Sequence, residues 1–290
     1  MDTIALVRRF NRTVTQQIGA LESSYLGRPR PLGASRALFE IGLDGLEVRQ
    51  LRTRLNLDSG YASRLLRQLE AEGLVKTGPS PSDSRARFVE LTSRGRKELA
   101  VLNRLSDAIA KSLLDPLTPT QRSDLAAAME KVERLLLAGA VRLTIEDPES
   151  PAAQQCIARY YQELAQRFET GFDPARSIAV GRADFAPPRG SFVMATLNGE
   201  PIGCGGLRYH SDYGEIKRMW VAGSSRGLGV GKRILHYLEE LTRKRRLPFV
   251  RLETNKVLAE AQAMYRSNGY REVKPFSDEV YAHHWFEKRL

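Results

Sequence analysis

The sequence predicts two domains, a mainly α-helical one in residues 1–139 and an α/β one with a mixed central sheet in residues 140–290. A chain of 290 residues suits two domains of ordinary size. As far as Gly139 most apolar residues recur at helical spacing, whereas a helix and then alternating strand patterns follow as far as Ser225. Two separate clusters of basic residues, one in each half, indicate two different anionic ligands.

The composition is that of a globular protein, with 42% hydrophobic and 27% charged residues. No apolar run is long enough to cross a bilayer, and the first residues lack the apolar core of a signal peptide. Only two cysteines occur, Cys156 and Cys204, so no disulfide framework is expected. We therefore expect a cytoplasmic protein with no membrane association, and no spacing of Cys, His or carboxylate residues predicts a metal site.

The net charge of +11 is concentrated in two short segments. Residues 1–140 contain 22 Lys or Arg and 16 Asp or Glu, whereas the segment from Arg49 to Lys97 contains 11 and 5, which is the whole excess of that half. Between Lys217 and Arg251 there are 10 basic and only 2 acidic residues. Such local excesses are typical of surfaces that bind polyanions.

The first half is predicted to be mainly helical, with one pair of strands near its middle. An irregular apolar stripe predicts a first helix from Ile4 to about Leu26, before Gly27, Pro29 and Pro31 interrupt it. Further helices are expected at 35–41, 47–55, 59–72, 93–114 and 120–138. A strand is expected to begin at 74–75, and after a turn at 78–83 a returning strand is expected at 87–91.

The helices at 47–55 and 59–72 have the pattern of a helix-turn-helix. Asp58 or Ser59 can cap the second helix, because their side-chain oxygens can accept hydrogen bonds from its free amides. One face of that helix is apolar and should pack against the core. Short polar residues and arginines on the opposite face suit entry into the major groove of DNA, where Arg can contact guanine or phosphate. The residues expected to contact DNA from this helix are Ser59, Ser63, Arg64 and Arg67.

A basic β-hairpin follows in the run D-S-R-A-R-F-V-E-L-T-S-R-G, which begins at Asp83. Its tip carries Arg85 and Arg87, which are placed to reach the DNA backbone or the minor groove beside the helix. The order of helix-turn-helix, E-x-x-G-L-V and D-x-R-x-R-x-V-x-L-T-x-x-G resembles the MarR family of winged-helix transcriptional regulators over roughly residues 1–138.

This resemblance implies a winged helix-turn-helix domain that binds double-stranded DNA, with Asp83 orienting Arg85. It also implies a homodimer formed through the terminal helices near 4–26 and 120–138. The alternatives are an ordinary solvated basic face, or a domain that has lost DNA binding and serves only for dimerisation. The ordered hairpin motif and the retained arginines favour DNA binding.

The second half is expected to begin with a strand through Val141, Leu143 and Ile145. The elements expected after it are a helix at 152–168, several strands as far as Ser225, a strand at 250–255, a helix at 259–270 closed by Gly269, and a final strand in H-W-F-E-K-R-L.

A glycine-rich loop, R-G-L-G-V-G at Arg226–Gly231, lies between a predicted strand at 215–221 and a further amphipathic helix. The amides of such a loop and the positive end of the helix attract an anion, and Gly229 and Gly231 let the backbone approach a phosphate closely. The loop is not a Walker loop, which needs Gly-Lys-Ser/Thr, and it comes too late in the domain for a dinucleotide-binding fold.

The pattern R-x-x-G-x-G after a strand resembles the pyrophosphate-binding motif of the GNAT acetyltransferase superfamily. The runs N-G-E-P-I-G-C-G-G-L-R and A-E-A-Q-A-M-Y-R-S-N-G-Y extend the resemblance over roughly residues 141–290. It implies that acetyl-CoA is the cosubstrate and that an acetyl group passes directly to an amine. The residues expected to bind acetyl-CoA are Met219, Val221, Arg226, Gly227, Leu228, Gly229, Val230, Gly231, Lys232 and Asn255.

The same resemblance assigns two catalytic side chains. The amine must lose a proton and the departing thiolate must gain one. Glu215 occupies the strand position at which some GNAT enzymes have a carboxylate that acts as the general base. Tyr265 occupies the position at which many of them have the general acid. As alternatives, Glu215 pairs with a neighbouring cation and Tyr265 is a core aromatic residue. Cys204 is expected to be a small packed residue rather than a nucleophile.

The sequence therefore predicts a bifunctional DNA-binding transcriptional regulator and acetyl-CoA-dependent N-acetyltransferase. The alternative is a regulator whose second domain senses acyl-CoA without catalysis, because sensing and catalysis need the same phosphate-binding loop. Both a small-molecule amine and a protein lysine remain open as the acetyl acceptor.

Overall fold

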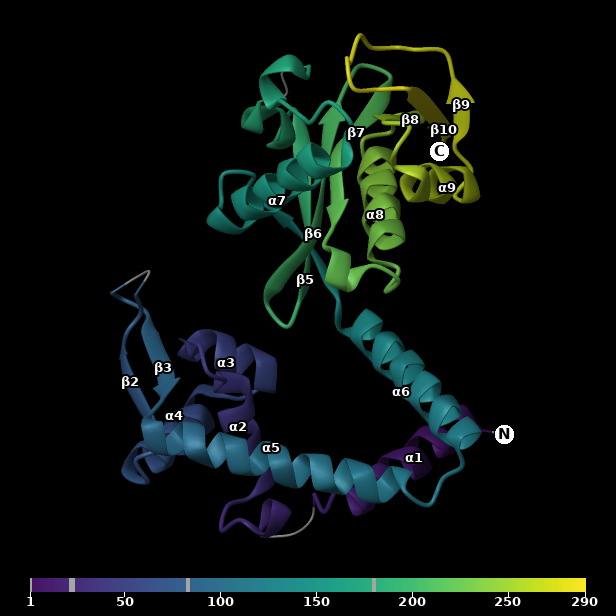
Figure 1. Cartoon of the computed structure of the whole chain (residues 1–290). Helices are drawn as coiled ribbons and strands as arrows, with labels where there is room; N and C mark the ends of the chain where they lie inside the picture. The colour runs from purple at the N-terminus through teal and green to yellow at the C-terminus, as the bar shows by residue number, and fades with distance from the viewer. Residues whose placement is uncertain (1, 21–23, 82–83, 179–180) are drawn as a thin grey trace. The chain divides into compact units, whose positions relative to one another are not determined.

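The computed structural model (Figure 1) describes residues 2–20, 24–81, 84–178 and 181–290. The chain divides into two compact units, unit 1 with residues 1–128 and unit 2 with residues 129–290. The dividing point falls inside helix α6 (Pro119–Ala140), whereas the predicted domain boundary at Gly139 lies at the end of that helix. None of the described helices has both the length and the apolar character needed to cross a membrane.

Unit 1 is mainly helical and contains a small antiparallel sheet, as predicted. Its strands lie in the order β1-β3-β2, and the paired strands β2 and β3 form the expected hairpin. Strand β1 was not expected, because two residues are too few to produce an alternating pattern. The elements are α1 (Thr3–Gln17), η1 (Tyr25–Gly27), α2 (Leu32–Ile41), β1 (Leu46–Glu47), α3 (Val48–Leu55), α4 (Ser59–Ala71), β2 (Val75–Pro79), β3 (Arg87–Leu91) and α5 (Ser93–Leu114).

The expectation of a first helix reaching about Leu26 is wrong, because α1 ends at Gln17. Gly19 takes a φ of +65°, a left-handed conformation that cannot continue an α-helix. The described apolar side chains of α1 are exposed, Ile4 by 70% and Val7 by 52%. The apolar stripe therefore does not face the core of this chain, and Leu21, which belonged to the predicted stripe, lies outside the described residues.

An ion cluster connects the segment before α2 to α4 and α5 in unit 1. Arg28 Nη2 lies 2.7 Å from Glu98 Oε2, and Arg30 Nη1 lies 2.7 Å from Glu98 Oε1. Arg30 also pairs with Glu72, at the C-terminal end of α4. Arg30 and Glu98 are 6% and 8% exposed, so their charges are stabilised by each other rather than by water.

Unit 2 is built on a seven-stranded sheet of order β4-β5-β6-β7-β8-β10-β9 within the described residues. Every neighbouring pair is antiparallel except β7 and β8, which confirms the predicted mixed sheet. The elements after α6 are β4 (Arg142–Glu146), α7 (Pro151–Arg167), η2 (Pro174–Arg176), η3 (Arg182–Phe185), β5 (Gly190–Leu197), β6 (Glu200–Tyr209), β7 (Tyr213–Val221), η4 (Gly223–Ser225), α8 (Val230–Lys244), β8 (Phe249–Thr254), α9 (Ala259–Ser267), β9 (Arg271–Val273) and β10 (His284–Arg289).

Two helices cover opposite faces of the sheet (Figure 1). Val193 of β5 packs in the cluster that includes Ile234 of α8, whereas its neighbour Phe192 packs in the cluster that includes Ile157 of α7. Successive residues of a strand point to opposite faces, so α7 and α8 lie on different sides of β5. Both helices contact β7, and this strand lies between the two cavities of the site described next and contributes Met219 to both of them.

Candidate active site and DNA-contacting surface

Strands β7 and β8 diverge in the centre of the sheet of unit 2. Their parallel pairing covers only Tyr213–Ile216 against Phe249–Leu252, although β7 continues to Val221. Beyond Ile216 the edge of β7 that faces β8 has no strand partner among the described residues. An exposed edge of this kind can bind an extended ligand through main-chain hydrogen bonds, as an added strand would.

A β-bulge at Arg218 accompanies this divergence. Arg218 has a φ of +53°, and the register between β6 and β7 shifts between Cys204 and Gly206. Bulges bend a strand and change the direction of its side chains, and they are frequent beside active sites. The thiol of Cys204 donates a weak hydrogen bond to the carbonyl oxygen of Arg218 at 3.5 Å. Cys204 is fully buried, as expected for a packed residue.

The predicted glycine-rich loop leads directly into α8. Gly227 and Gly229 have φ values of +83° and +74°, a region that favours glycine, and Gly229 is the N-cap of the helix. Because the N-cap residue is a glycine, it has no side chain that could bond the first amide groups of α8, and these groups suit an anion. Lys232 is exposed in the first turn. The guanidinium of Arg226 is partly engaged, because it pairs with Glu163 of α7 and donates to the carbonyl of Val221.

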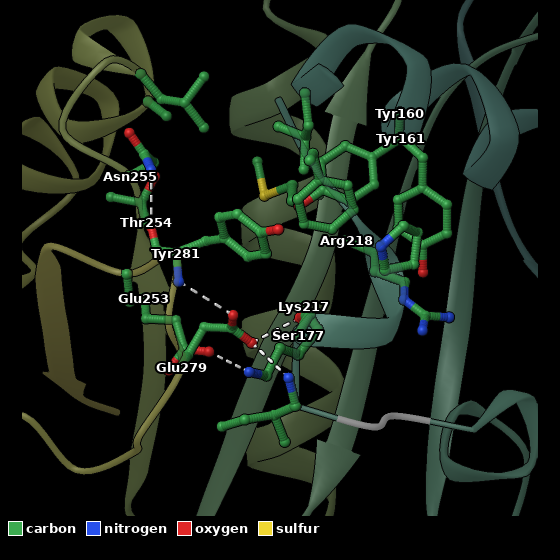
Figure 2. Close-up of a pocket in the computed structure, with 18 of the residues that line it drawn as sticks. Tyr160, Tyr161, Ser177, Lys217, Arg218, Glu253, Thr254, Asn255, Glu279 and Tyr281 are labelled. Carbon is green, nitrogen blue, oxygen red and sulfur yellow. Dashed lines mark hydrogen bonds and ion pairs between the residues drawn. The ribbon is translucent and has the colours of Figure 1, made fainter. Parts of the chain in front are cut away.

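Two cavities adjoin the diverging strands. The first, which we call the loop cavity, has a volume of about 470 Å³, and its walls include Val221, Arg226, Gly229, Gly231, Lys232 and Tyr265. The second, which we call the aromatic cavity, has a volume of about 320 Å³, and its walls include Tyr161, Phe172, Lys217, Glu253, Glu279 and Tyr281 (Figure 2).

Tyr265 and Met219 line both cavities, so they lie where the two meet. Tyr265, on α9, is 6% exposed, and its ring lies 5.9 Å from that of Tyr270 and 5.8 Å from that of Phe286. Burial raises the pKa of the Tyr265 phenol, which therefore keeps its proton at neutral pH. The structure thus places Tyr265, Met219 and residues of the glycine-rich loop around one cavity.

Charged residues gather at one end of the aromatic cavity (Figure 2). Lys217 pairs with Glu253 of β8 and lies 3.4 Å from Glu215. Burial lowers the pKa of Lys217, but Glu215, Glu253 and Glu279 together raise it by more, so the lysine stays charged. Glu279 accepts hydrogen bonds from the Ser177 hydroxyl at 2.6 Å and from the Ile178 amide at 2.9 Å.

Glu215, the predicted base, lines neither cavity. It is 5% exposed and lies within 3.5 Å of Arg208, 3.0 Å of His210 and 3.4 Å of Lys217. A general base must reach the proton that it removes, and here Lys217 stands beside Glu215 at the cavity wall. The geometry therefore matches the alternative in which Glu215 is paired with neighbouring cations.

Two of the predicted acetyl-CoA contacts, Leu228 and Asn255, do not line the loop cavity. Leu228 packs against the apolar core beside α8. Asn255 lines the aromatic cavity, where its amide donates to the Tyr281 carbonyl at 2.8 Å and its side-chain oxygen accepts from the Val257 amide. The side chain of Asn255 therefore fixes the segment that carries Tyr281.

Glu253 and Glu279 were not among the residues predicted from the sequence. Glu253 had a recognisable signal, because it precedes the carboxyl end of β8, and ligands of α/β sheets bind beyond the carboxyl ends of parallel strands. Glu279 follows no element with a recognisable pattern, and it meets Ser177 only because the chain returns from a distant part of the sequence. Among the described residues, no group of three or more His, Cys, Asp or Glu side chains is arranged to hold a metal ion.

The predicted DNA-contacting residues lie on the surface of unit 1. On α4, Ala62, Leu65, Leu66 and Leu69 are buried, whereas Ser59, Arg64 and Arg67 are exposed and Ser63 is partly exposed. Asp58 is the cap of this helix, and its carboxylate accepts from the Tyr61 amide at 2.9 Å.

The hairpin arginines Arg85 and Arg87 are exposed as well. Arg87 donates to the hydroxyl of Thr77 on the neighbouring strand at 3.1 Å. The predicted pairing of Arg85 with Asp83 cannot be described, because Asp83 lies outside the described residues. The arginines of α4 and of the hairpin thus form an exposed cationic surface on unit 1.

Comparisons with known proteins match each half of the chain separately. The family model described as the acetyltransferase (GNAT) family matches residues 157–270, and that of the MarR family matches residues 26–86. An IAA acetyltransferase of Azospirillum brasilense is 33% identical over 131 residues, which are 44% of this chain and 84% of the relative.

Two further proteins are similar to parts of the chain. An uncharacterised HTH-type transcriptional regulator of Bacillus subtilis, YdgJ, is 29% identical over 79 residues, which are 27% of this chain and 48% of that protein. One solved structure is that of a Klebsiella pneumoniae protein named as a putative acyl-CoA N-acyltransferase. It aligns with a TM-score of 0.42 and 24% identity, and the alignment covers 52% of this chain and 97% of that one.

Proposed function

Because the chain belongs to the GNAT acetyltransferase family through its second half and carries a MarR-family helix-turn-helix domain in its first, we propose that it is a cytoplasmic DNA-binding regulator that also transfers an acetyl group from acetyl-CoA to an amine. The observation that carries the catalytic part is the position of Tyr265, which lines both the loop cavity and the aromatic cavity. A proton donor at that junction can serve a reaction between two substrates that enter from different sides.

Acetyl-CoA fits the loop cavity. The free amides at the start of α8, with Lys232 and Arg226 nearby, suit a pyrophosphate group. The unpaired edge of β7 suits the pantetheine arm, which carries amide groups that can pair with main chain. In this arrangement the thioester lies near Met219, whose backbone amide is the proposed donor to its carbonyl oxygen.

Acetyl transfer requires two proton movements. We assign the base to Glu279, because it lines the aromatic cavity and forms no ion pair within the part of the chain that the structure describes. The ammonium group of the acceptor gives a proton to Glu279, and the amine nitrogen then attacks the thioester carbon. As the carbon–sulfur bond breaks, the sulfur takes the proton of the Tyr265 hydroxyl. The nitrogen, now bonded to the acetyl carbon, loses its surplus proton, and this proton restores the Tyr265 phenol.

Calorimetry with acetyl-CoA, followed by thiol release with a panel of amines, tests the proposal. Binding together with amine-dependent thiol release is the expected result. Binding without release from any amine would favour the sensor alternative, in which unit 2 recognises acyl-CoA without catalysis. A protein that does not bind acetyl-CoA would overturn the assignment of the loop cavity.

The assignment of the base predicts different effects for two conservative variants. Glu279→Gln should lower kcat about ten- to a hundredfold, because the amide can accept the bonds from Ser177 and Ile178 but cannot take a proton. Glu215→Gln should lower it no more than a few-fold, because this side chain lines neither cavity. Steady-state kinetics over a pH series make the comparison. A larger loss in Glu215→Gln than in Glu279→Gln would return the role of base to Glu215.

DNA binding predicts a loss of affinity when the hairpin arginines are removed. Each phosphate contact that is lost weakens binding and reduces its salt dependence, so Arg85→Ala with Arg87→Ala should weaken operator binding about ten- to a hundredfold. Electrophoretic retardation of a fragment carrying the protein's own promoter, at several salt concentrations, measures this. Arg104→Ala, on α5, is the control. Equal affinity of the double variant and the wild type would remove the hairpin from the interface.

We also propose a homodimer, in which a second copy covers the exposed apolar face of α1. This helix has no buried residue in the described structure, although Ile4, Val7 and Phe10 are large and apolar. Large exposed apolar patches usually mark interaction sites. Sedimentation equilibrium gives the mass directly, and a mass equal to that of one chain at micromolar concentration would contradict the proposal.

A further inference from the structure

The aromatic cavity contains a continuous group of five aromatic rings. Tyr160 and Tyr161 of α7 lie with ring centroids 5.6 Å apart, and Tyr161 lies 5.3 Å from Phe172. Phe172 lies 4.8 Å from Tyr281, which lies 5.7 Å from Phe168. All five side chains line the cavity, and they come from segments about a hundred residues apart in the sequence. We call this group the ring cluster (Figure 2 labels three of its members).

The ring cluster differs from an ordinary packed core, because its rings border an empty volume. A flat aromatic group that enters such a space gains the offset or edge-to-face contacts that aromatic pairs prefer. An aliphatic chain of similar length gains only the burial of apolar surface. The cavity therefore favours a ligand that carries an aromatic ring.

The volume of the cavity limits the size of that ligand. At about 320 Å³ it lies at the lower end of the range of small-molecule sites, which extends from about 300 to 1,000 Å³. This space suits a molecule with one ring system and a short side chain. A lysine side chain presented by a protein would bring its amine into the cavity but no ring to contact the ring cluster.

The carboxylate of Glu279 at the end of the aromatic cavity indicates which group the short side chain of the ligand carries. Glu279 accepts hydrogen bonds from the Ser177 hydroxyl and from the Ile178 and Tyr281 amides, all of them neutral donors. The charged Lys217 at the same end of the cavity pairs with Glu253. Tyr281, two residues further, contributes its ring to the cluster. A carboxylate next to aromatic faces is the combination that binds an ammonium group, through the opposite charge and through cation–π attraction.

We propose that the acetyl acceptor is a small arylalkylamine, a primary amine joined to one aromatic ring system by a short chain. This inference rests on the proposed acetyltransferase function and specifies its substrate class. The ring of the acceptor lies within the ring cluster, and its ammonium group lies next to Glu279 with the nitrogen directed towards Met219 and Tyr265. The overall reaction converts the protonated amine and acetyl-CoA into the N-acetylamine, CoA and one proton.

The first test compares 2-phenylethylamine with butylamine, which has the length and the amine of a lysine side chain. Their binding to the protein saturated with CoA is measured by calorimetry, so the comparison does not depend on turnover. We expect 2-phenylethylamine to bind at least tenfold more tightly, and the ratio of kcat/KM values to follow the same order. Equal binding, or tighter binding of butylamine, would overturn the inference and point to an aliphatic or lysine acceptor.

A pair of matched variants tests the role of the ring cluster. Phe172→Leu keeps an apolar side chain but removes a ring that contacts three others, whereas Phe276→Leu makes the same change at a ring that does not line the cavity. Phe172→Leu should weaken 2-phenylethylamine binding about five- to tenfold and change butylamine binding less than twofold. Phe276→Leu should change neither. A Phe172→Leu variant that weakens both amines equally would contradict the inference.

Failure of the inference and failure of the proposed function are distinguishable in these experiments. If acetyl-CoA does not bind, the acetyltransferase function itself is overturned. If acetyl-CoA binds but the ring of the amine makes no difference to its affinity, only the substrate class is overturned. Thiol release with butylamine, at a rate equal to that with 2-phenylethylamine, would leave the transferase intact and the acceptor class wrong.

Discussion

Replacing Tyr265 by phenylalanine is expected to lower kcat for acetyl transfer about a hundredfold while leaving the Kd for acetyl-CoA within about twofold. The change removes one oxygen from a buried ring and keeps the packing against Tyr270 and Phe286. General acid catalysis contributes about 10²- to 10⁴-fold in enzymes, and the lower end applies where water can also protonate the departing thiolate. Initial rates of thiol release give kcat, and calorimetry gives the Kd for acetyl-CoA.

Tyr270→Phe is the matched control for this prediction. Tyr270 is buried next to Tyr265, with ring centroids 5.9 Å apart, but it lines neither cavity. Tyr270→Phe therefore removes an equivalent hydroxyl from a ring that lines neither cavity, and kcat should change less than twofold. If Tyr265→Phe retained full turnover, the phenol would have no part in the mechanism, and the core-packing alternative for this residue would hold.

Replacing Glu98 by alanine is expected to destabilise unit 1 by about 3–5 kcal/mol. Removal of one partner of a buried ion pair leaves an uncompensated charge, and here the variant would leave Arg30 buried with only Glu72 beside it. Glu90→Ala removes an exposed ion pair with Lys76 and should cost less than about 1 kcal/mol. Both tryptophans, Trp220 and Trp285, lie in unit 2. Far-ultraviolet circular dichroism should therefore show the loss, while tryptophan fluorescence stays near the wild-type transition.

The same cluster should make the stability of unit 1 depend on pH. The hydrogen bond from Arg28 lowers the pKa of Glu98 most, burial opposes this shift, and the charge of Arg30 adds to the lowering. A carboxyl with a lowered pKa in the folded state contributes stability above its unfolded pKa, about 4.3, and this contribution is lost as the pH falls further. Unfolding of the wild type should become easier below about pH 4.3, with a shallower dependence in Glu98→Gln. Identical pH dependence in the two proteins would show that the cluster does not contribute.

Much of the fold follows from the sequence because it depends on residues close to one another in the chain. The apolar face of α4 repeats every three or four residues, and Asp58 caps that helix three residues from its hydrogen-bond donor. The glycine-rich loop before α8 is recognisable for the same reason, because the backbone conformations of Gly227 and Gly229 favour glycine. The elements missed or misplaced were the short strands β1 and β9 and the end of α1, which carry too few residues or too weak a pattern.

The charged and aromatic residues of the aromatic cavity could not be identified in this way. Glu215 occupied the expected place on its strand, but whether it faced a cavity or a cation depended on Arg208, His210 and Lys217 and on the bend of β7. The bulge at Arg218 gave no signal, because a positive φ at arginine contradicts its ordinary preference.

The sequence by itself determined the two families, the order of most elements, the glycine-rich loop before α8 and the place of Tyr265 on α9. The tertiary structure alone decided that β7 and β8 separate after Ile216, that Glu279 faces the cavity, and that the rings of Tyr161, Phe172 and Tyr281 meet there. The physical reason is the range of the interactions. Motifs and helix periods arise from neighbours within a few residues, whereas the cavity is formed by segments about a hundred residues apart, which only the packing of the whole unit brings together.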